Sequence, residues 1–321
     1  MLQANVQAQG VRNSLTAFDR DRRPRHPGEI LVFEGTDGLD VYNPSIPFES
    51  VGRTVIAGRV ESRDSEKSKT MFFEPRGTVW APVAGAPSLP LQDPFVSFFR
   101  DGLVLGGVNV TWDGDRLVEY HTDFYKGKDI FHLELFLSGP TFMKDVRLLE
   151  LPDGRVAVFS RPQGQPMLDR YGCIAKIGFA IAPSLDSVTA DFIEGAPLLE
   201  GHFLPDEWGG SNQPYNLKNG LVGVIGHESW GETVDGVFYI HYYSMAFAID
   251  PETRSMTPSK VIGTRDCFPA GPQKDKRSQD VVFTSGILRR KDGKALLYCG
   301  LSDCQVGCLE IDDPFLAYET L

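Results

Sequence analysis

An aspartate in a mostly apolar stretch could supply an acid. Asp93 stands between Leu91-Gln92 and Pro94-Phe95. Apolar neighbours can desolvate a carboxyl group and favour its neutral form, which carries a proton that it can donate. Such a group can act as a general acid that protonates a departing oxygen as its bond breaks. An aspartate before a proline also makes an ordinary turn, so both interpretations of Asp93 stay open.

Two arginines beside predicted strands could bind an anion. Arg59 follows the apolar run 55–57, which points to a buried setting where a charge requires a partner, and Arg161 precedes Pro162. A guanidinium stays charged and presents a planar fork of donors that matches tetrahedral oxyanions bidentately. Each arginine taken alone is also compatible with a solvated surface charge.

A histidine and a tyrosine occupy comparable places further along the chain. His227 terminates the apolar run 222–226, and Tyr242 opens the next predicted strand. Both side chains can hydrogen-bond an anion or a hydroxyl group. A lone histidine near a core strand is equally compatible with a structural role.

These residues lie among short apolar runs with a two-residue period, the pattern of half-buried strands. Asp-Gly and Asn-Gly dipeptides separate the runs and supply the positive φ of tight hairpins. No long segment keeps a 3.6-residue apolar repeat with a cap at each end, so we expect few and short helices. The runs are 29–33, 54–57, 103–105, 155–159, 221–225 and 295–298, and the dipeptides begin at Asp101, Asp113, Asp153, Asn219, Asp235 and Asp292.

The strand-turn-strand theme recurs at roughly 50 to 65 residues, a spacing that fits the blades of a β-propeller. A β-sandwich or a β-helix would produce many of the same signals. The 321 residues are enough for one large core, and we expect a single all-β domain.

Charge and cysteine content limit the partners and the location. The net charge of −11 disfavours nucleic acid and membranes as partners, although a few local arginines can still hold a small anion. Residues 1–24 show no signal-peptide pattern, and no run approaches the roughly 18 apolar residues of a membrane span. Five cysteines without CxxC spacing argue against disulfides and structural zinc, so we expect reduced thiols and a cytoplasmic protein. We find no sequence motif for a metal or nucleotide cofactor and expect none.

Several short segments, each at a strand end or in the following turn, occur in a characteristic order. They are Tyr42-Asn43-Pro44-Ser45, Ala57-Gly58-Arg59-Val60-Glu61, Gln92-Asp93-Pro94-Phe95, Lys144-Asp145-Val146-Arg147, Phe159-Ser160-Arg161-Pro162, Gly226-His227, Tyr242 before Ala248-Ile249-Asp250, 281–286 and 298–303. Together they resemble the mannoside phosphorylases of glycoside hydrolase family 130 and the related mannosyltransferase/phosphorylases. The resemblance implies a five-bladed β-propeller formed by one domain over residues 1–321, with 1–26 as a peripheral N-terminal segment.

The resemblance also implies a role for each polar residue in these segments. Asp93 matches the aspartate of the family's Glu-Asp-Pro-Arg motif, which is the general acid. Carboxylates and amides at strand ends suit the hydroxyl groups of a sugar. The resemblance places phosphate on Arg59, Arg161, His227 and Tyr242, and the sugar on Asn43, Ser45, Asp145 and Asp303.

The sequence departs from the family pattern in three places. Gln92 replaces the motif's glutamate and Phe95 its arginine, so contacts beside the acid differ. The lysine that the family carries ahead of the histidine strand has no clear counterpart in residues 206–210. This gap weakens the prediction of free phosphate as substrate.

We therefore predict an inverting single displacement on a mannose-containing oligosaccharide, such as a β-1,2-mannan. Its co-substrate would be phosphate, mannose 1-phosphate or GDP-mannose, and Asp145 is the alternative acid. A hydrolase on the same fold is one alternative, with a second carboxylate from Glu61, Asp64 or Glu228 activating water. A catalytically silent propeller that binds a glycan or a protein is another.

Overall fold

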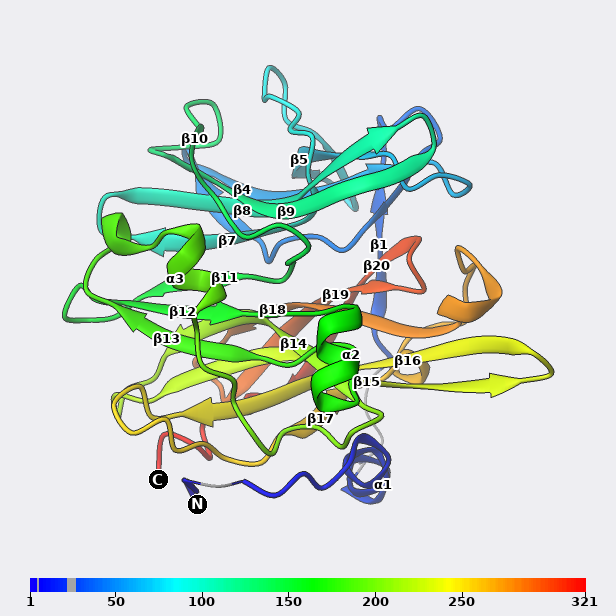
Figure 1. Ribbon diagram of the computed structural model, residues 1–321. Coiled ribbons are helices and arrows are strands. Elements are labelled where there is room, and N and C mark those ends of the chain that lie inside the picture. The colour runs from blue at the N-terminus through cyan, green and yellow to red at the C-terminus, as the bar shows by residue number, and fades with distance from the viewer. Residues whose placement is uncertain (5, 22–26) are drawn as a thin grey trace.

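The computed structural model describes residues 1–4, 6–21 and 27–321. This part of the chain contains twenty β-strands and three short α-helices, as predicted for an all-β protein (Figure 1). None of these helices combines the length and the apolar composition needed to cross a membrane. The helices are α1 (Val11–Asp21), α2 (Gln165–Tyr171) and α3 (Ala190–Glu194).

Strands that follow one another in sequence pair antiparallel in successive groups. The first group contains β2–β6, and the second, β7–β10, is a separate four-stranded sheet. Within the first group, the short strand β3 pairs with the beginning of β4. The bounds are β2 (Asp40–Tyr42), β3 (Phe48–Ser50), β4 (Arg53–Glu61), β5 (Ser68–Arg76), β6 (Val79–Pro82), β7 (Gln92–Phe99), β8 (Gly102–Asp113), β9 (Arg116–Gly127) and β10 (Glu134–Ser138).

The remaining strands form a third, a fourth and a fifth group. The third, β11–β13, is a three-stranded sheet, the fourth contains β14–β17, and the fifth joins β18–β20 to the early strand β1. The bounds are β11 (Arg147–Glu150), β12 (Val156–Ser160), β13 (Gly178–Ala182), β14 (Trp208–Asn216), β15 (Val222–Val234), β16 (Val237–Ile249), β17 (Lys260–Gly263), β18 (Asp280–Arg289), β19 (Lys294–Leu301), β20 (Gln305–Asp312) and β1 (Glu29–Phe33).

Two parallel pairings join groups into one thirteen-stranded sheet. β16 pairs with β18 at Tyr242 and Val281, and β1 pairs with β6 at Val32 and Val79. Because β1 also pairs antiparallel with β20, the beginning of the chain is hydrogen-bonded to its end. Figure 1 shows both termini at the same edge of the molecule.

The long β15–β16 hairpin illustrates how the turn residues act. Asp235 and Gly236 both have positive φ, at 50° and 78°, and they connect Val234 to its partner Val237. A two-residue turn of this kind matches the twist of paired strands. The Asp-Gly dipeptide predicted a hairpin here, and the hairpin is present, extending beyond the other strands in Figure 1.

Each of five buried apolar clusters lies mainly between two neighbouring groups of strands. Burial of one sheet face against the next removes apolar area from water, which stabilises the arrangement. The pairs of groups are first–second (Val55, Val96), second–third (Val104, Val158), third–fourth (Phe179, Phe247), fourth–fifth (Ile225, Leu297) and fifth–first (Val306, Val41).

The first strands of the second to fifth groups lie side by side, and the first strand of the first group lies beside the fifth group. β7 contacts β11, β11 contacts β14, and β14 contacts β18, while β2 contacts β19 and β20. Polar residues carried by these strands, or placed immediately beside them, are therefore brought towards one another.

The predicted peripheral segment, residues 1–26, includes positions 5 and 22–26, which lie outside the described residues. The described part contains α1, which contacts β17 and β15 and buries Val11 and Phe18 in the largest apolar cluster.

Candidate active site

Residues from all five groups line one cavity of about 200 Å³. Eight of the nine predicted site residues are among them, and only Ser45 is not. The eight are Asn43, Arg59, Asp93, Asp145, Arg161, His227, Tyr242 and Asp303, and the others are Tyr42, Glu66, Lys144, Ile240, Lys274, Val281 and Phe283.

Ser45 has a structural position instead. Its hydroxyl donates to the carbonyl oxygen of Ile46 at 2.8 Å and accepts the N–H of Ala57 at 3.0 Å. The side chain is buried and bonded on both sides. Ser45 therefore holds the β2–β3 connection against β4, outside the cavity lining.

The backbone at the cavity is unusual at four of these positions. Asn43, Asp93, Asp145 and Asp303 have φ values of 42°, 49°, 60° and 55°. Asparagine and aspartate tolerate this left-handed region better than other residues with a Cβ, and such conformations cluster at functional sites. These four residues therefore adopt the turn conformation that the sequence suggested, and they also line the cavity.

Asp93 lies where the pairing of β7 with β8 is interrupted. Gln92 pairs with Val108 but Phe95 pairs with Gly106, so a bulge surrounds Asp93 and turns its side chain towards the cavity. Its Oδ1 accepts hydrogen bonds from Asn43 Nδ2 at 2.8 Å and from Arg59 Nη1 at 3.1 Å. Oδ2 has no partner among the described residues, which leaves this oxygen available to a ligand.

Arg59 is buried, as its sequence context predicts, and carboxylates surround it. Glu61 Oε2 accepts from Nε at 2.9 Å and from Nη2 at 2.7 Å, and Glu66 Oε2 accepts from Nη2 at 2.9 Å. With Asp93 on Nη1, the donor fork is almost fully occupied. One N–H of Nη1 has no partner among the described residues, so an anionic ligand can make a bidentate contact with Arg59 only by replacing one of these carboxylates.

Arg161 keeps more of its donors free. Nε donates to the Gly209 carbonyl at 2.8 Å, and Nη1 donates to Gln163 Oε1 at 2.7 Å and lies 3.2 Å from Asp145 Oδ2. Within the described ranges, Nη2 has no partner. Arg161 is therefore better placed than Arg59 to bind an anion directly.

The carboxyl groups of Asp145 and Asp303 have opposite tendencies. Burial raises the pKa of Asp145, but Arg161 and Arg147 outweigh it, so this pKa lies below its usual value. Burial, with a further contribution from Asp93, raises the pKa of Asp303 to about 6 although Arg59 opposes it. Asp145 is thus an ionised carboxylate, whereas Asp303 can hold a proton near neutral pH.

His227 faces the cavity as a neutral imidazole. Burial, assisted by Arg161, lowers its pKa to about 3. Nδ1 lies 2.7 Å from Asn212 Oδ1, which makes Nδ1–H the donor and leaves Nε2 as an acceptor without a partner in the described part of the chain. His227 can therefore accept a hydrogen bond from a hydroxyl group of a sugar or of a protonated phosphate.

Tyr242 stacks on His227, with ring centroids 5.2 Å apart and planes 21° from parallel. Its hydroxyl accepts the indole N–H of Trp208 at 2.9 Å and can still donate to a ligand. Ile240, Val281 and Phe283 add an apolar wall of the kind that packs against a sugar ring.

Two lysines supply positive charge that sequence reasoning missed. Lys144 precedes Asp145 within a segment already singled out, so its position was a usable signal. Lys274 comes from an irregular segment without any motif, and only the tertiary structure places it in the cavity. The segment 206–210 carries no lysine, and it contributes Trp208, Gly209 and Gly210 to the beginning of β14.

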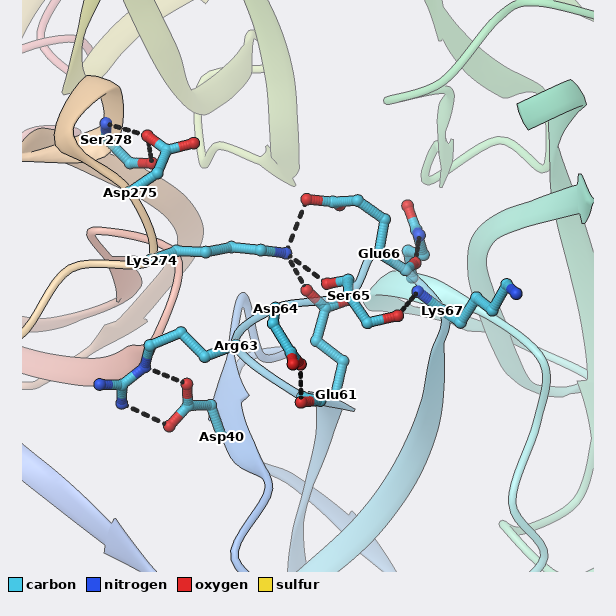
Figure 2. A network of polar contacts seen from close by, with 12 residues as sticks. Asp40, Glu61, Arg63, Asp64, Ser65, Glu66, Lys67, Lys274, Asp275 and Ser278 are labelled. Atoms are coloured by element: carbon cyan, nitrogen blue, oxygen red, sulfur yellow. Dashed lines mark hydrogen bonds and ion pairs between the residues drawn. The ribbon is translucent and has the colours of Figure 1, made fainter. Parts of the chain in front are cut away.

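Lys274 joins a network at one side of the cavity (Figure 2). Its Nζ contacts the fully buried carboxylate of Glu61, lies 2.6 Å from Glu66 Oε1 and donates to the Ser65 carbonyl at 2.8 Å. Tyr42 donates its hydroxyl to the same Glu61. The network balances the charge of Arg59 and Lys274 below the cavity surface.

The three carboxylates considered for activating water lie outside the cavity lining. Glu61 is bound to Arg59 and Lys274, Asp64 accepts from Ser62 in an exposed turn, and Glu228 is buried against Ser259. The lining itself carries four carboxyl groups and four cationic groups, with Glu66, Asp93, Asp145 and Asp303 facing Arg59, Lys144, Arg161 and Lys274.

Comparison with known proteins identifies the family. A profile described as protein of unknown function (DUF1861) matches residues 18–317. No curated protein sequence matches the chain. Among solved structures, the chain is similar to MPT-4, a mannose phosphorylase from Leishmania mexicana in complex with a phosphate ion. The identity is 38%, the TM-score is 0.88, and the match covers 96% of this chain and 94% of that one.

Two further structures extend the comparison. MPT-1, a GDP-Man-dependent mannosyltransferase from Leishmania mexicana, is 36% identical with a TM-score of 0.86, over 95% of this chain and 94% of that one. A β-1,2-mannobiose phosphorylase from Listeria innocua shares the fold, at 15% identity and a TM-score of 0.60, over 94% of this chain and 95% of that one. The chain therefore belongs to the DUF1861 family and, with the Leishmania proteins, to the family of mannose phosphorylases and mannosyltransferases that its sequence resembles.

Proposed function

We propose that this protein transfers mannose, either between a β-mannoside and phosphate or from a phosphorylated donor to a sugar acceptor. The observation that carries the proposal is the convergence of Asp93, Arg161, His227 and Tyr242 in one cavity. The mannose phosphorylase and the GDP-Man-dependent mannosyltransferase from Leishmania mexicana support it, since both are similar over almost their whole length.

The proposed reaction is a single displacement with inversion at the anomeric carbon. Asp93 gives its proton to the glycosidic oxygen, directly or through a hydroxyl of the neighbouring sugar, as the C1–O bond breaks. A phosphate oxygen attacks C1 from the opposite face, which forms mannose 1-phosphate. Phosphate is already a competent nucleophile, so the reaction needs no second carboxylate as a base.

Each side of the cavity then has a function. Arg161, Lys144, His227 and Tyr242 bind and orient phosphate, while Arg59 and Asn43 hold the Asp93 carboxyl group in place. Asp145 and Asp303 bind sugar hydroxyls, a task that suits carboxyl groups with free lone pairs. In the reverse direction, the Asp93 carboxylate accepts the proton of the acceptor hydroxyl.

The fold and the setting belong to the same proposal. The five groups of strands are five blades of a β-propeller, a view supported by the five apolar clusters between neighbouring groups, and residues 1–321 form one domain with a peripheral N-terminal segment. The partners are a mannose-containing oligosaccharide, such as a β-1,2-mannan, and phosphate, mannose 1-phosphate or GDP-mannose. We further propose that the enzyme needs no metal or organic cofactor, binds neither nucleic acid nor membrane, and is cytoplasmic, in line with five free cysteines.

A hydrolase is the second candidate, and the low pKa of Asp145 favours it, because an ionised carboxylate in the same cavity could activate water. A catalytically silent propeller does not require an acid beside an anion site, so the arrangement of Asp93 and Arg161 does not favour this candidate.

The products distinguish these functions. Purified protein is incubated with short β-mannosides with and without phosphate, and then with mannose 1-phosphate or GDP-mannose and an acceptor. Mannose 1-phosphate formed only with phosphate, or an extended mannoside from either donor, is the expected result. Free mannose formed without phosphate would show a hydrolase, and no product under any condition would contradict the proposal.

A further inference from the structure

Glu66 is the exposed member of a ring of carboxylates around Arg59. It lies in the turn 62–67 between β4 and β5, where Figure 2 shows its carboxylate reaching Lys274, and it lines the cavity. Its Oε2 is 2.9 Å from Arg59 Nη2, and its Oε1 is 2.6 Å from Lys274 Nζ. Two cations thus hold the two oxygens of one carboxylate, as they would hold two oxygens of an anionic ligand.

The three carboxylates around Arg59 differ in how easily they can leave. The side chains of Glu61 and Asp93 are 0% and 6% exposed, whereas that of Glu66 is 57% exposed. Moving a buried carboxylate away from its partner leaves an unpaired interior charge, which is strongly unfavourable. A carboxylate that is more than half exposed can instead exchange its ion pair for water at small cost.

The turn itself is fastened, so the movement required is a rotation of the Glu66 side chain. Gln92 Nε2 donates to the Glu66 carbonyl at 2.7 Å, and Lys274 Nζ donates to the Ser65 carbonyl at 2.8 Å. These contacts hold the main chain but leave the Glu66 carboxylate free to turn outwards. Arg59 then keeps the buried carboxylates of Glu61 and Asp93, and Lys274 keeps Glu61 and the Ser65 carbonyl. Each of the two cations exposes one donor to the cavity.

We propose that Glu66 is an internal anion that occupies Arg59 and Lys274 until an anionic co-substrate displaces it, and that it thereby sets the affinity for that co-substrate. This inference rests on the proposed function, because it assumes that a phosphate-bearing ligand enters the cavity. It adds Arg59 and Lys274 to the groups that contact the phosphate-bearing ligand, as the sequence predicted for Arg59, while Nη1 of Arg59 still holds Asp93.

The test measures binding of inorganic phosphate by isothermal titration calorimetry to the wild type and to Glu66→Gln. The amide keeps the size of the side chain but removes the competing charge, so we expect phosphate to bind about 5-fold more tightly, the scale of one exposed ion pair. Glu74→Gln is the matched control. Glu74 pairs with Arg53 at 3.0 Å and Arg76 at 3.2 Å outside the cavity lining, so its loss should leave phosphate affinity unchanged.

The outcomes separate this inference from the proposed function. Phosphate binding to the wild type with equal or weaker binding to Glu66→Gln would overturn the role of Glu66 and leave the proposed function standing. A weaker affinity of Glu66→Gln for a β-mannoside, with unchanged phosphate affinity, would make Glu66 a sugar ligand and also overturn it. Binding only to Glu66→Gln would support the inference. No binding of phosphate to either protein would contradict it and would also exclude phosphorolysis, whereas transfer from GDP-mannose would still be decided by the product assay.

Discussion

The carboxyl groups in the cavity are chemically alike as residues but differ in their surroundings. Asp93 has one oxygen bonded to Asn43 and Arg59 and the other free. Asp145 is kept ionised by two arginines, and burial favours the protonated form of Asp303. Environments that push pKa values apart are how one site assigns acid and base functions.

Replacing Asp93 by asparagine tests the acid directly. In the Asp93→Asn variant, the amide residue would tolerate the positive φ of 49° and keep most hydrogen bonds, but it has no transferable proton. We expect a folded protein whose turnover of an unactivated mannoside falls by roughly 100-fold or more. Steady-state kinetics measure this, with Asp153→Asn in the exposed turn between β11 and β12 as the control. Turnover near that of the wild type would reassign the acid to Asp303, because the low pKa of Asp145 makes it a poor proton donor.

A buried histidine outside the cavity should make stability depend on pH. Both ring nitrogens of His202 lack a partner among the described residues, and burial lowers its pKa from 6.5 to about 4. The unfolded chain therefore binds more protons than the folded protein as pH falls from about 6.5 towards 4, and stability is lost over that range. In His202→Leu this loss is absent.

Urea unfolding at pH 7.5 and 5.5 measures the effect. We compare the unfolding free energy of His202→Leu with that of the wild type at each pH. Between pH 7.5 and 5.5 this difference should change by about 1 kcal/mol in favour of His202→Leu. His132→Gln, at an exposed histidine, is the control and should show no such change. A difference between His202→Leu and the wild type that is the same at both pH values would contradict the explanation.

At the level of elements, β14 positions two side chains that neighbouring strands carry into the cavity. Gly210 pairs with His227 on β15, and the carbonyl of Gly209 accepts from Arg161. A Cβ on Gly210 would lie 2.8 Å from His227 Cε1 and 2.9 Å from Arg161 Cδ. The strand carries a glycine there because two cavity residues fill the space of its side chain.

Gly210→Ala should accordingly weaken phosphate binding without touching the ligand. The methyl group displaces the middle of two buried side chains, which cannot move away freely in a close-packed interior. We expect about a 10-fold loss of phosphate affinity, the scale of one impaired charged contact. Gly263→Ala crowds Leu297 at the same 2.8 Å outside the cavity and should affect stability but not affinity. Equal affinities of the two variants in calorimetry would show that β14 does not position the anion site.

At the scale of the whole molecule, the cavity exists because separate sheets meet. Arg59, Asp93, Arg161 and His227 come from four different groups of strands, and the apolar clusters between neighbouring groups fix their relative positions. Ionisable residues that are far apart in the sequence therefore interact electrostatically in one cavity. The net charge of −11 says little about this cavity, where four cationic groups face four carboxyl groups.

The sequence by itself determined the class of fold and most of the cavity residues. Period-two runs and Asp-Gly turns predicted the strands and the β15–β16 hairpin, because alternation and positive φ are local properties of the chain. The ordered segments located eight lining residues through their family resemblance. Arg59, His227 and Tyr242 lie inside β4, β15 and β16, so the local pattern of strand ends alone would not have placed them.

Only the tertiary structure decided which of these side chains are free to bind a ligand. The sequence could not show that Ser45 faces away, that carboxylates occupy the Arg59 fork, or that Lys274 reaches the cavity from an irregular segment. It also could not set the pKa values of Asp145 and Asp303 apart. Burial and charge pairing depend on distances between residues that are remote in sequence, and those distances are fixed only when the sheets pack together.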